Sequence, residues 1–383
     1  MRERFPFSKI STLTLFVLLV GSSLGSASAS LTVKKIAPIA EIGAGYQSLA
    51  ITPTHIALAG EGIEVRDRVS GARVVVQESS TSLLFTDLTT SASASGASFI
   101  AVGISESSVV TSREQSDGAI NPDSITVASE EEKKVGLTRL ILVEFTSSGE
   151  TTRTSFFDSD KPLLPRSIHL FGEEIVIVGD IASDRGHQGF MVRRALSGED
   201  FQLSRFGEMN TSIFAAANLR TLYGSSEENL VGSKRQGASD GVILYLDKTG
   251  KAVKAVRSFA SGAKREWSDV SPVHLAVGPL IRGKTSEVAI TDFDSQGKPE
   301  WSTRIPGVMG LVEGRAVGVI TKARIKALPG FRANSNHALF LQFDKKGSIK
   351  SAASIPAISI IDIFEDHALV KVKSGATQLI SFS

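Results

Sequence analysis

Three features of the sequence predict an all-β protein made of repeated four-stranded antiparallel sheets. A strand followed by a tight turn ending in glycine recurs along most of the chain. From Gly149 to Gly347 these glycines are spaced 47 to 52 residues apart. Short apolar runs of strand length lie between them. A period of this size is typical of a repeat architecture.

The repeating unit is clearest around Gly250. Its turn is Asp247-Lys248-Thr249-Gly250, and strands are expected at residues 242–246 and 253–259 on either side. Residues 217–223 and 229–232 supply two further expected strands, so each unit contains four. The same turn glycine ends five other segments, at Gly71, Gly149, Gly198, Gly297 and Gly347.

The inner strands of the units are apolar on both faces, as at residues 100–102, 140–143, 175–178 and 339–341. A half-exposed antiparallel strand would alternate between apolar and polar residues, so both faces of these strands are predicted to be buried. Radially stacked blades bury them in this way, because each blade is covered by a neighbour on both sides. The sequence therefore predicts a β-propeller.

Counting the units predicts seven blades. The six turn glycines mark six blades, and residues 358–364, 367–373 and 376–382 form three more strands that lack a fourth. The segment at residues 31–36 is strand-like and lies at the other end of the chain. We expect this N-terminal strand to complete the seventh blade and close the ring.

Short motifs in several units resemble known propeller repeats. Gln188-Gly189-Phe190-Met191-Val192-Arg193, a turn at Gly198 and then Arg205-Phe206-Gly207 resemble the bacterial β-propeller repeat. Asp294-Ser295-Gln296-Gly297 followed by Trp301 is similar to the quinoprotein-type repeat. The resemblance implies the propeller fold, and these families share no single activity.

The start of the chain predicts an exported protein. Arg2, Arg4 and Lys9 precede an apolar run at residues 13–20 and small residues up to Ala29, so residues 1–29 are expected to be a signal peptide. Residues 30–383 are expected to form a single propeller domain, with no membrane span and no nucleic-acid partner.

The chain has 42 Lys and Arg against 40 Asp and Glu, and outside the leader it carries 39 of each. It has no cysteine, which excludes disulfides and an acylated cysteine.

The loops between the second and third strands differ most in length and carry an excess of positive charge. The distance from the glycine of the second strand to the turn glycine ranges from 11 to 46 residues. In a propeller these loops share one rim, and insertions on one rim commonly mark the binding face. The candidate ligand-binding residues are Arg185, His187, Lys234, Arg235, Arg282, Lys284, Lys322, Arg324, Lys326 and Arg332. Scattered loop cations that only keep the protein soluble are the alternative.

The longest of these loops, residues 105–135 in the second repeat, has the opposite charge. It contains seven acidic residues, three basic residues and no aromatic residue, so a flexible segment is expected. A second hypothesis is that it folds over the basic rim and competes with a ligand.

Catalytic motifs are weak. The six histidines do not cluster at metal-ligand spacing, and no paired carboxylates stand apart from the repeat. Asp292 and Asp294 could bind calcium, but Asp294 occupies a turn position that favours a structural role.

We expect a monomeric binding or scaffolding module at the bacterial cell surface, without cofactor or metal, that recognises an anionic glycan, envelope polymer or protein. The alternatives are a carbohydrate-active enzyme and a quinone-dependent dehydrogenase with its site on the same rim.

Overall fold

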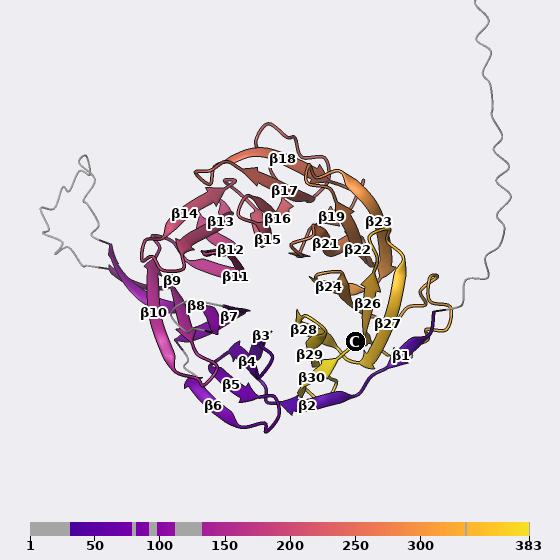
Figure 1. Ribbon diagram of the computed structural model, residues 1–383. Helices are drawn as coiled ribbons and strands as arrows, with labels where there is room; N and C mark the ends of the chain where they lie inside the picture. Colours follow the sequence, from indigo (N-terminus) through magenta and orange to yellow (C-terminus); the bar gives the residue numbers. More distant parts are fainter. Residues whose placement is uncertain (1–30, 79–81, 92–97, 112–131, 334, 383) are drawn as a thin grey trace, which may run out of the picture. The chain divides into compact units, whose positions relative to one another are not determined.

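The computed structural model describes residues 31–78, 82–91, 98–111, 132–333 and 335–382. All regular elements of these residues are β-strands, and they form seven sheets arranged around a ring (Figure 1). The predicted propeller of seven four-stranded antiparallel blades is therefore confirmed. The expected signal peptide lies outside the described residues.

The first four blades follow one another along the chain. Blade 1 contains β3 (Tyr46–Ile51), β4 (His55–Gly60), β5 (Ile63–Asp67) and β6 (Arg73–Gln77). Blade 2 contains β7 (Leu83–Thr90), β8 (Phe99–Thr111), β9 (Glu132–Phe145) and β10 (Thr151–Asp158). Blade 3 contains β11 (Leu163–Phe171), β12 (Glu174–Ser183), β13 (Gly186–Ala195) and β14 (Gln202–Phe206). Blade 4 contains β15 (Thr211–Asn218), β16 (Thr221–Ser226), β17 (Asp240–Leu246) and β18 (Ala252–Ser258).

The last three blades depart from the simple pattern. The inner strand of blade 5 is divided, so this blade contains β19 (Lys264–Arg265), β20 (Asp269–Val270), β21 (Leu275–Arg282), β22 (Thr285–Phe293) and β23 (Pro299–Pro306). Blade 6 contains β24 (Val308–Glu313), β25 (Ala316–Thr321), β26 (His337–Phe343), β27 (Ile349–Pro356) and an added outer strand, β1 (Val33–Lys35). Blade 7 contains β28 (Ser359–Phe364), β29 (His367–Lys371), β30 (Thr377–Ser381) and β2 (Pro38–Ile42).

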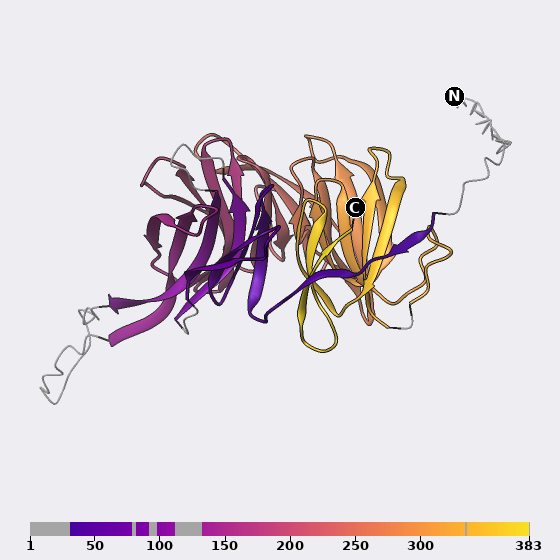
Figure 2. The ribbon, with the colours of Figure 1, turned by 60° about the horizontal axis from the view of Figure 1, so that its bottom comes forward.

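The ring is closed by an N-terminal strand, but a few residues later than predicted. β2 pairs antiparallel with β30, with Ile42 opposite Thr377. The expected segment contains β1 instead, which pairs in parallel with β27 of blade 6. Burial explains the difference: Ile42 is 2% exposed in the core of blades 7 and 1, whereas Lys34 and Lys35 are exposed. In Figure 2 the two strands run across the sides of blades 6 and 7.

The inner strands are buried on both faces, as predicted. In β12, Ile175 and Ile177 pack with side chains of blade 2, while Val176 and Val178 pack with side chains of blade 4. All four have no exposed surface. Each interface between blades is thus a core made by alternate residues of neighbouring sheets.

Two local predictions were wrong. Residues 217–223, predicted to be one strand, contain the end of β15, a turn and the start of β16. Residues 229–232, predicted to be the next strand, belong to a loop in which Leu230 makes an isolated bridge with Ser233. The second strand of blade 4 is therefore β16, whose polar end, Ser225 and Ser226, is buried.

Both ends of the long acidic loop lie in β-strands, and the flexibility expected for residues 105–135 stays a prediction. β8 and β9 continue past the rest of blade 2 as an antiparallel ribbon, with Thr111 opposite Glu132. The ribbon projects from the ring in Figures 1 and 2. Residues 112–131, including the part proposed to cover the rim, lie outside the described residues.

The recurring turns have the structural role that the sequence indicated. Asp294 Oδ1 accepts hydrogen bonds from the backbone N–H groups of Gln296 and Lys298 at 2.9 and 2.8 Å. Asp292 is buried and pairs with Arg315 of blade 6 at 2.9 Å.

Trp301, the residue that suggested a quinoprotein-type repeat, packs against the turn of the next blade. A Cβ at Gly347 would come within 2.6 Å of its indole ring, and Gly347 has a φ of +80°. The turn glycine is therefore required both by the backbone and by the docking of the neighbouring blade.

Candidate functional site

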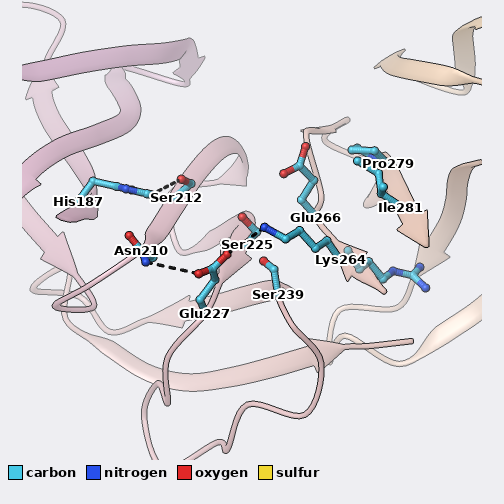
Figure 3. Close-up of a pocket in the computed structure, with 11 residues that line it drawn as sticks. His187, Asn210, Ser212, Ser225, Glu227, Ser239, Lys264, Glu266, Pro279 and Ile281 are labelled. Carbon is cyan, nitrogen blue, oxygen red and sulfur yellow. Dashed lines mark hydrogen bonds and ion pairs between the residues drawn. The ribbon is translucent and has the colours of Figure 1, made fainter. Parts of the chain in front are cut away.

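A polar cleft of about 300 Å³ opens where blades 3, 4 and 5 meet at the rim that carries the loops between second and third strands (Figure 3). Its volume is at the lower end of the range for small-molecule sites. The lining residues are His187, Asn210, Ser212, Ser225, Glu227, Ser239, Lys264, Arg265, Glu266, Pro279 and Ile281.

The divided inner strand of blade 5 shapes this cleft. β19 pairs Lys264 with Ile281 and Arg265 with Leu280, and β20 resumes the pairing at Asp269. The residues between the two strands, beginning with Glu266, leave the regular ladder. Three consecutive charged residues thus line the cleft, where each of the other blades has an undivided inner strand.

The loop at residues 227–239, which forms another wall, is held in place by a buried ion pair. Asp240 is fully buried and lies 3.2 Å from the Arg257 guanidinium. Its carboxylate also accepts hydrogen bonds from the N–H groups of Gln236 and Gly237 at 2.9 and 2.7 Å. Asp240 is therefore a structural residue. The wall is fixed before any ligand arrives.

Two groups of polar contacts cross the cleft (Figure 3). Glu227 accepts a hydrogen bond from Asn210 Nδ2 at 3.4 Å and pairs with Lys264 Nζ at 3.6 Å. His187 Nε2 lies 2.9 Å from Ser212 Oγ.

Glu266 and Arg265 are the two lining residues whose charges are perturbed by burial. Burial raises the pKa of the Glu266 carboxyl, which favours its neutral form. Burial also lowers the pKa of Arg265 to about 10, with a smaller effect from the charge of Arg304. Arg265 nevertheless remains protonated at neutral pH.

Eight of the ten predicted residues lie on loops between second and third strands, while His187 lies in β13 and Arg282 ends β21; only one of the ten lines the cleft. That residue is His187. Arg235 supports its own loop by donating to the Glu227 carbonyl at 2.9 Å. The remaining eight are exposed and have no ion pair within the described ranges: Arg185, Lys234, Arg282, Lys284, Lys322, Arg324, Lys326 and Arg332.

The sequence analysis missed the charged group Lys264-Arg265-Glu266. It lies between the outer strand of blade 4 and the inner strand of blade 5, a connection whose length appeared constant. The available indication was its position: three charged residues directly precede Trp267, which is fully buried. Such a run interrupts the apolar inner strand that the repeat requires.

A second cavity, of about 400 Å³, lies along the inner strands at the centre of the ring. A register shift interrupts the inner strand of blades 1, 2, 3, 4, 6 and 7. Three half-buried aspartates line this cavity, Asp87, Asp269 and Asp362. They accept hydrogen bonds from neighbouring blades, as when Val312 N donates to Asp269 Oδ2 at 2.7 Å. Their role is to join blades.

The comparisons with known proteins support the fold. Neither a protein-family profile nor a curated protein sequence matches the chain. The acylaminoacyl peptidase of Pyrococcus horikoshii has a similar structure, with a TM-score of 0.51 and 9% identity over 88% of this chain and 51% of that chain. The chain thus spans about half of the peptidase.

Two further solved structures are less similar. The β-propeller domain of the Trilobed protease from Pyrococcus furiosus has a TM-score of 0.49 and 10% identity, over 89% of this chain and 96% of that chain. TolB from Acinetobacter baumannii has a TM-score of 0.42 and 13% identity, over 79% and 66% of the two chains. At 9% identity, the likeness to the peptidase shows a fold and no activity. Within the described residues, no helix is long and apolar enough to cross a bilayer.

Proposed function

We propose that the protein is an exported binding or scaffolding module at the bacterial cell surface, and that its basic rim binds an anionic glycan or envelope polymer. One observation carries the proposal. Six cations on the rim of blades 5 and 6 lack an acidic partner among the described residues: Arg282, Lys284, Lys322, Arg324, Lys326 and Arg332. Arginine and lysine are the side chains that bind carboxylates and phosphates in proteins.

The contrast with blades 2 and 3 supports this proposal. On the same rim, Arg139 pairs with Asp158 at 2.7 Å and Lys161 with Asp184 at 2.7 Å. Arg205 is also ion-paired, with Asp160. These three rim cations are thus paired with aspartates, although Arg185 of blade 3 is not, whereas the six cations of blades 5 and 6 keep their charge available. Uncompensated charge on one sector attracts anions and directs their approach.

Replacing two of these cations tests the proposal. The variant Arg282→Gln/Lys284→Gln is expected to bind immobilised polygalacturonate or polyphosphate about five- to tenfold more weakly than the wild type, since each exposed contact contributes up to about 1 kcal/mol. Binding by the wild type should fall as salt rises, because exposed charges are screened.

A matched control is Lys345→Gln/Lys346→Gln, which removes the same charge from an exposed turn on the opposite rim. This control should bind like the wild type. An equal loss in the two variants would show that net charge, and not the rim, governs binding. No binding of either polymer by the wild type at low salt would reject the proposal.

A carbohydrate-active enzyme is the second candidate, because the cleft brings two carboxyls into different environments. Glu266 has a pKa raised by burial, while Glu227 pairs with Lys264. A carboxyl whose pKa is raised by burial, in one cleft with a second, ion-paired carboxyl, suits the acid and base roles of glycoside hydrolysis. Glu266→Gln should then abolish cleavage of uronic-acid oligosaccharides while polymer binding persists. If concentrated wild-type protein cleaves none of them, this second candidate is rejected.

A further inference from the structure

We infer that the cleft of blades 3, 4 and 5 receives a carboxylate or phosphate group carried by a sugar, and that the Arg265 guanidinium binds this group. The inference rests on the proposed function and deepens it, because it assigns the recognition of the anionic group to one residue away from the exposed rim cations. Arg265 is absent from the residues that the sequence indicated.

Arg265 is buried but has no carboxylate partner among the described residues. The residue is 8% exposed, and its Nε is enclosed and makes no hydrogen bond. Among the residues that the structure describes, none places a carboxylate oxygen within 4.0 Å of its side-chain nitrogens. Buried charges in proteins are ordinarily paired, because removing an ion from water is costly.

The other deeply buried arginines of this chain follow that rule. Arg194 is paired with Glu144, and the side chain of Arg257, 3% exposed, is paired with Asp240. Both pairs join strands within or between blades. Arg265 lines a cleft open to solvent and lacks such a partner. An anion from solution would supply the missing charge.

Arg265 is also held ready for a ligand. Its guanidinium carbon lies 4.3 Å from the centre of the Trp267 ring, and Trp267 is fully buried. Its backbone N–H donates to the Ser239 carbonyl at 2.9 Å. A planar guanidinium stacked in this way can still present two N–H donors to a carboxylate or phosphate, and little side-chain freedom is lost on binding.

The rest of the cleft suits a sugar. Lys264 adds a second positive charge, since its side chain is 65% exposed while it pairs with Glu227. Ser212, Ser225 and Ser239 provide hydroxyl groups along the wall. A volume of about 300 Å³ accommodates a small ligand and not a folded partner. An acidic or phosphorylated sugar requires positive charge for its anionic group and hydrogen-bonding groups for its hydroxyls, and the cleft provides both.

The two tryptophans make the test direct. Trp267 contacts Arg265, whereas Trp301 packs on Phe343 of blade 6. In a Trp301→Phe background, titration with galacturonate, glucose 6-phosphate and inorganic phosphate should therefore change Trp267 fluorescence in a saturable way. Galactose, which is neutral, should not. The comparison of galacturonate with phosphate distinguishes a sugar acid from a free anion.

Two substitutions complete the experiment. Arg265→Gln should weaken galacturonate binding at least about tenfold, because charged hydrogen bonds are lost, and Arg265→Lys should give an intermediate loss. Without ligand, Arg265→Gln should melt at the same or a higher temperature, because an uncompensated charge is removed. An unchanged affinity in Arg265→Gln, or a saturable response to galactose equal to that with galacturonate, would overturn the inference.

Failure of this inference can be distinguished from failure of the proposed function. If polygalacturonate binds to the wild type and to Arg265→Gln equally, the rim binds the polymer and the cleft does not. If no polymer binds to any variant, both proposals are rejected. If polymer binding is lost both in Arg265→Gln and in Arg282→Gln/Lys284→Gln, the cleft and the basic rim form one binding site.

Discussion

A chain that begins at residue 43 is expected to lose most of its stability, whereas one that begins at residue 37 should stay folded. The longer truncation removes β2, and with it the antiparallel partner of β30 and the buried Ile42. Removing a buried isoleucine from a core costs about 2–5 kcal/mol, and each unpaired backbone hydrogen bond adds about 1 kcal/mol. The sum is comparable with the 5–15 kcal/mol that stabilises a typical domain.

The shorter truncation is the control, since it removes only β1. Residues Val33 to Lys35 pair with the outer edge of blade 6, and two of the three are exposed. Thermal melting of both chains and hydrogen exchange of the β30 amides would measure the difference. The β30 amides should lose protection only in the longer truncation. Equal melting temperatures in the two chains would contradict closure by β2.

Ser48→Ala is expected to destabilise the ring by about 2–3 kcal/mol, because the buried Ser48 joins two half-buried carboxyls. Its Oγ lies 2.7 Å from Asp87 Oδ1 and 2.7 Å from Asp362 Oδ2. A hydroxyl has one proton to donate, so one of the two carboxyls must itself carry a proton and donate to Ser48. Without Ser48, the two acids would face each other with no group between them.

The effect extends around the ring through backbone hydrogen bonds. Leu49 N donates to Asp362 at 2.8 Å, and Ile168 N donates to Asp87 at 2.7 Å. Blades 7, 1, 2 and 3 are connected in this way at the point where the ring closes. Ser295→Ala, in an exposed turn, is the control and should leave the melting temperature unchanged.

The same carboxyls make stability depend on pH. Burial raises the pKa of Asp87 to about 6, and burial followed by the charge of Asp87 raises that of Asp362 well above its ordinary value. An acid whose pKa is higher in the folded protein stabilises the fold while it is protonated. This contribution is complete at a pH below the pKa in the unfolded chain, about 4, and is lost as the pH rises through the pKa in the folded protein. Asp269, with a pKa of about 7, acts in the same direction.

Asp362→Asn isolates this contribution from the opposing one of His169, whose pKa is lowered to about 4 by burial. Between pH 5 and pH 8, the melting temperature of Asp362→Asn should fall less than that of the wild type, because the amide cannot ionise. Parallel melting curves of the two proteins across this range would mean that Asp362 is ionised in the folded state.

The features predicted correctly from the sequence are local. Asp294 and Gly297 form a turn with backbone N–H groups within a few residues, so spacing alone identifies the motif. The apolar runs of strands such as β12 require cover on both faces, which indicated stacked blades. Seven blades followed by counting.

The site could not be predicted in the same way. His187 and Lys264 line one cleft although 77 positions separate them, and their meeting depends on how three blades pack. The sequence does not show that Arg265 lacks an ion-pair partner, because the residues next to an arginine along the chain do not indicate whether a distant carboxylate reaches it. The choice between two N-terminal strand segments likewise depended on which one could bury Ile42 beside β30.

The sequence by itself determined the repeat, the blade count and the rim on which the variable loops and cations lie, because strand period and turn chemistry act over a few residues. The tertiary structure alone decided which strand closes the ring, which aspartates are joined through Ser48 and where a buried guanidinium remains without an anion. Each of these depends on the distance between groups far apart in the chain. Ser48 and Asp362, separated by 314 positions and joined at 2.7 Å, are the clearest case.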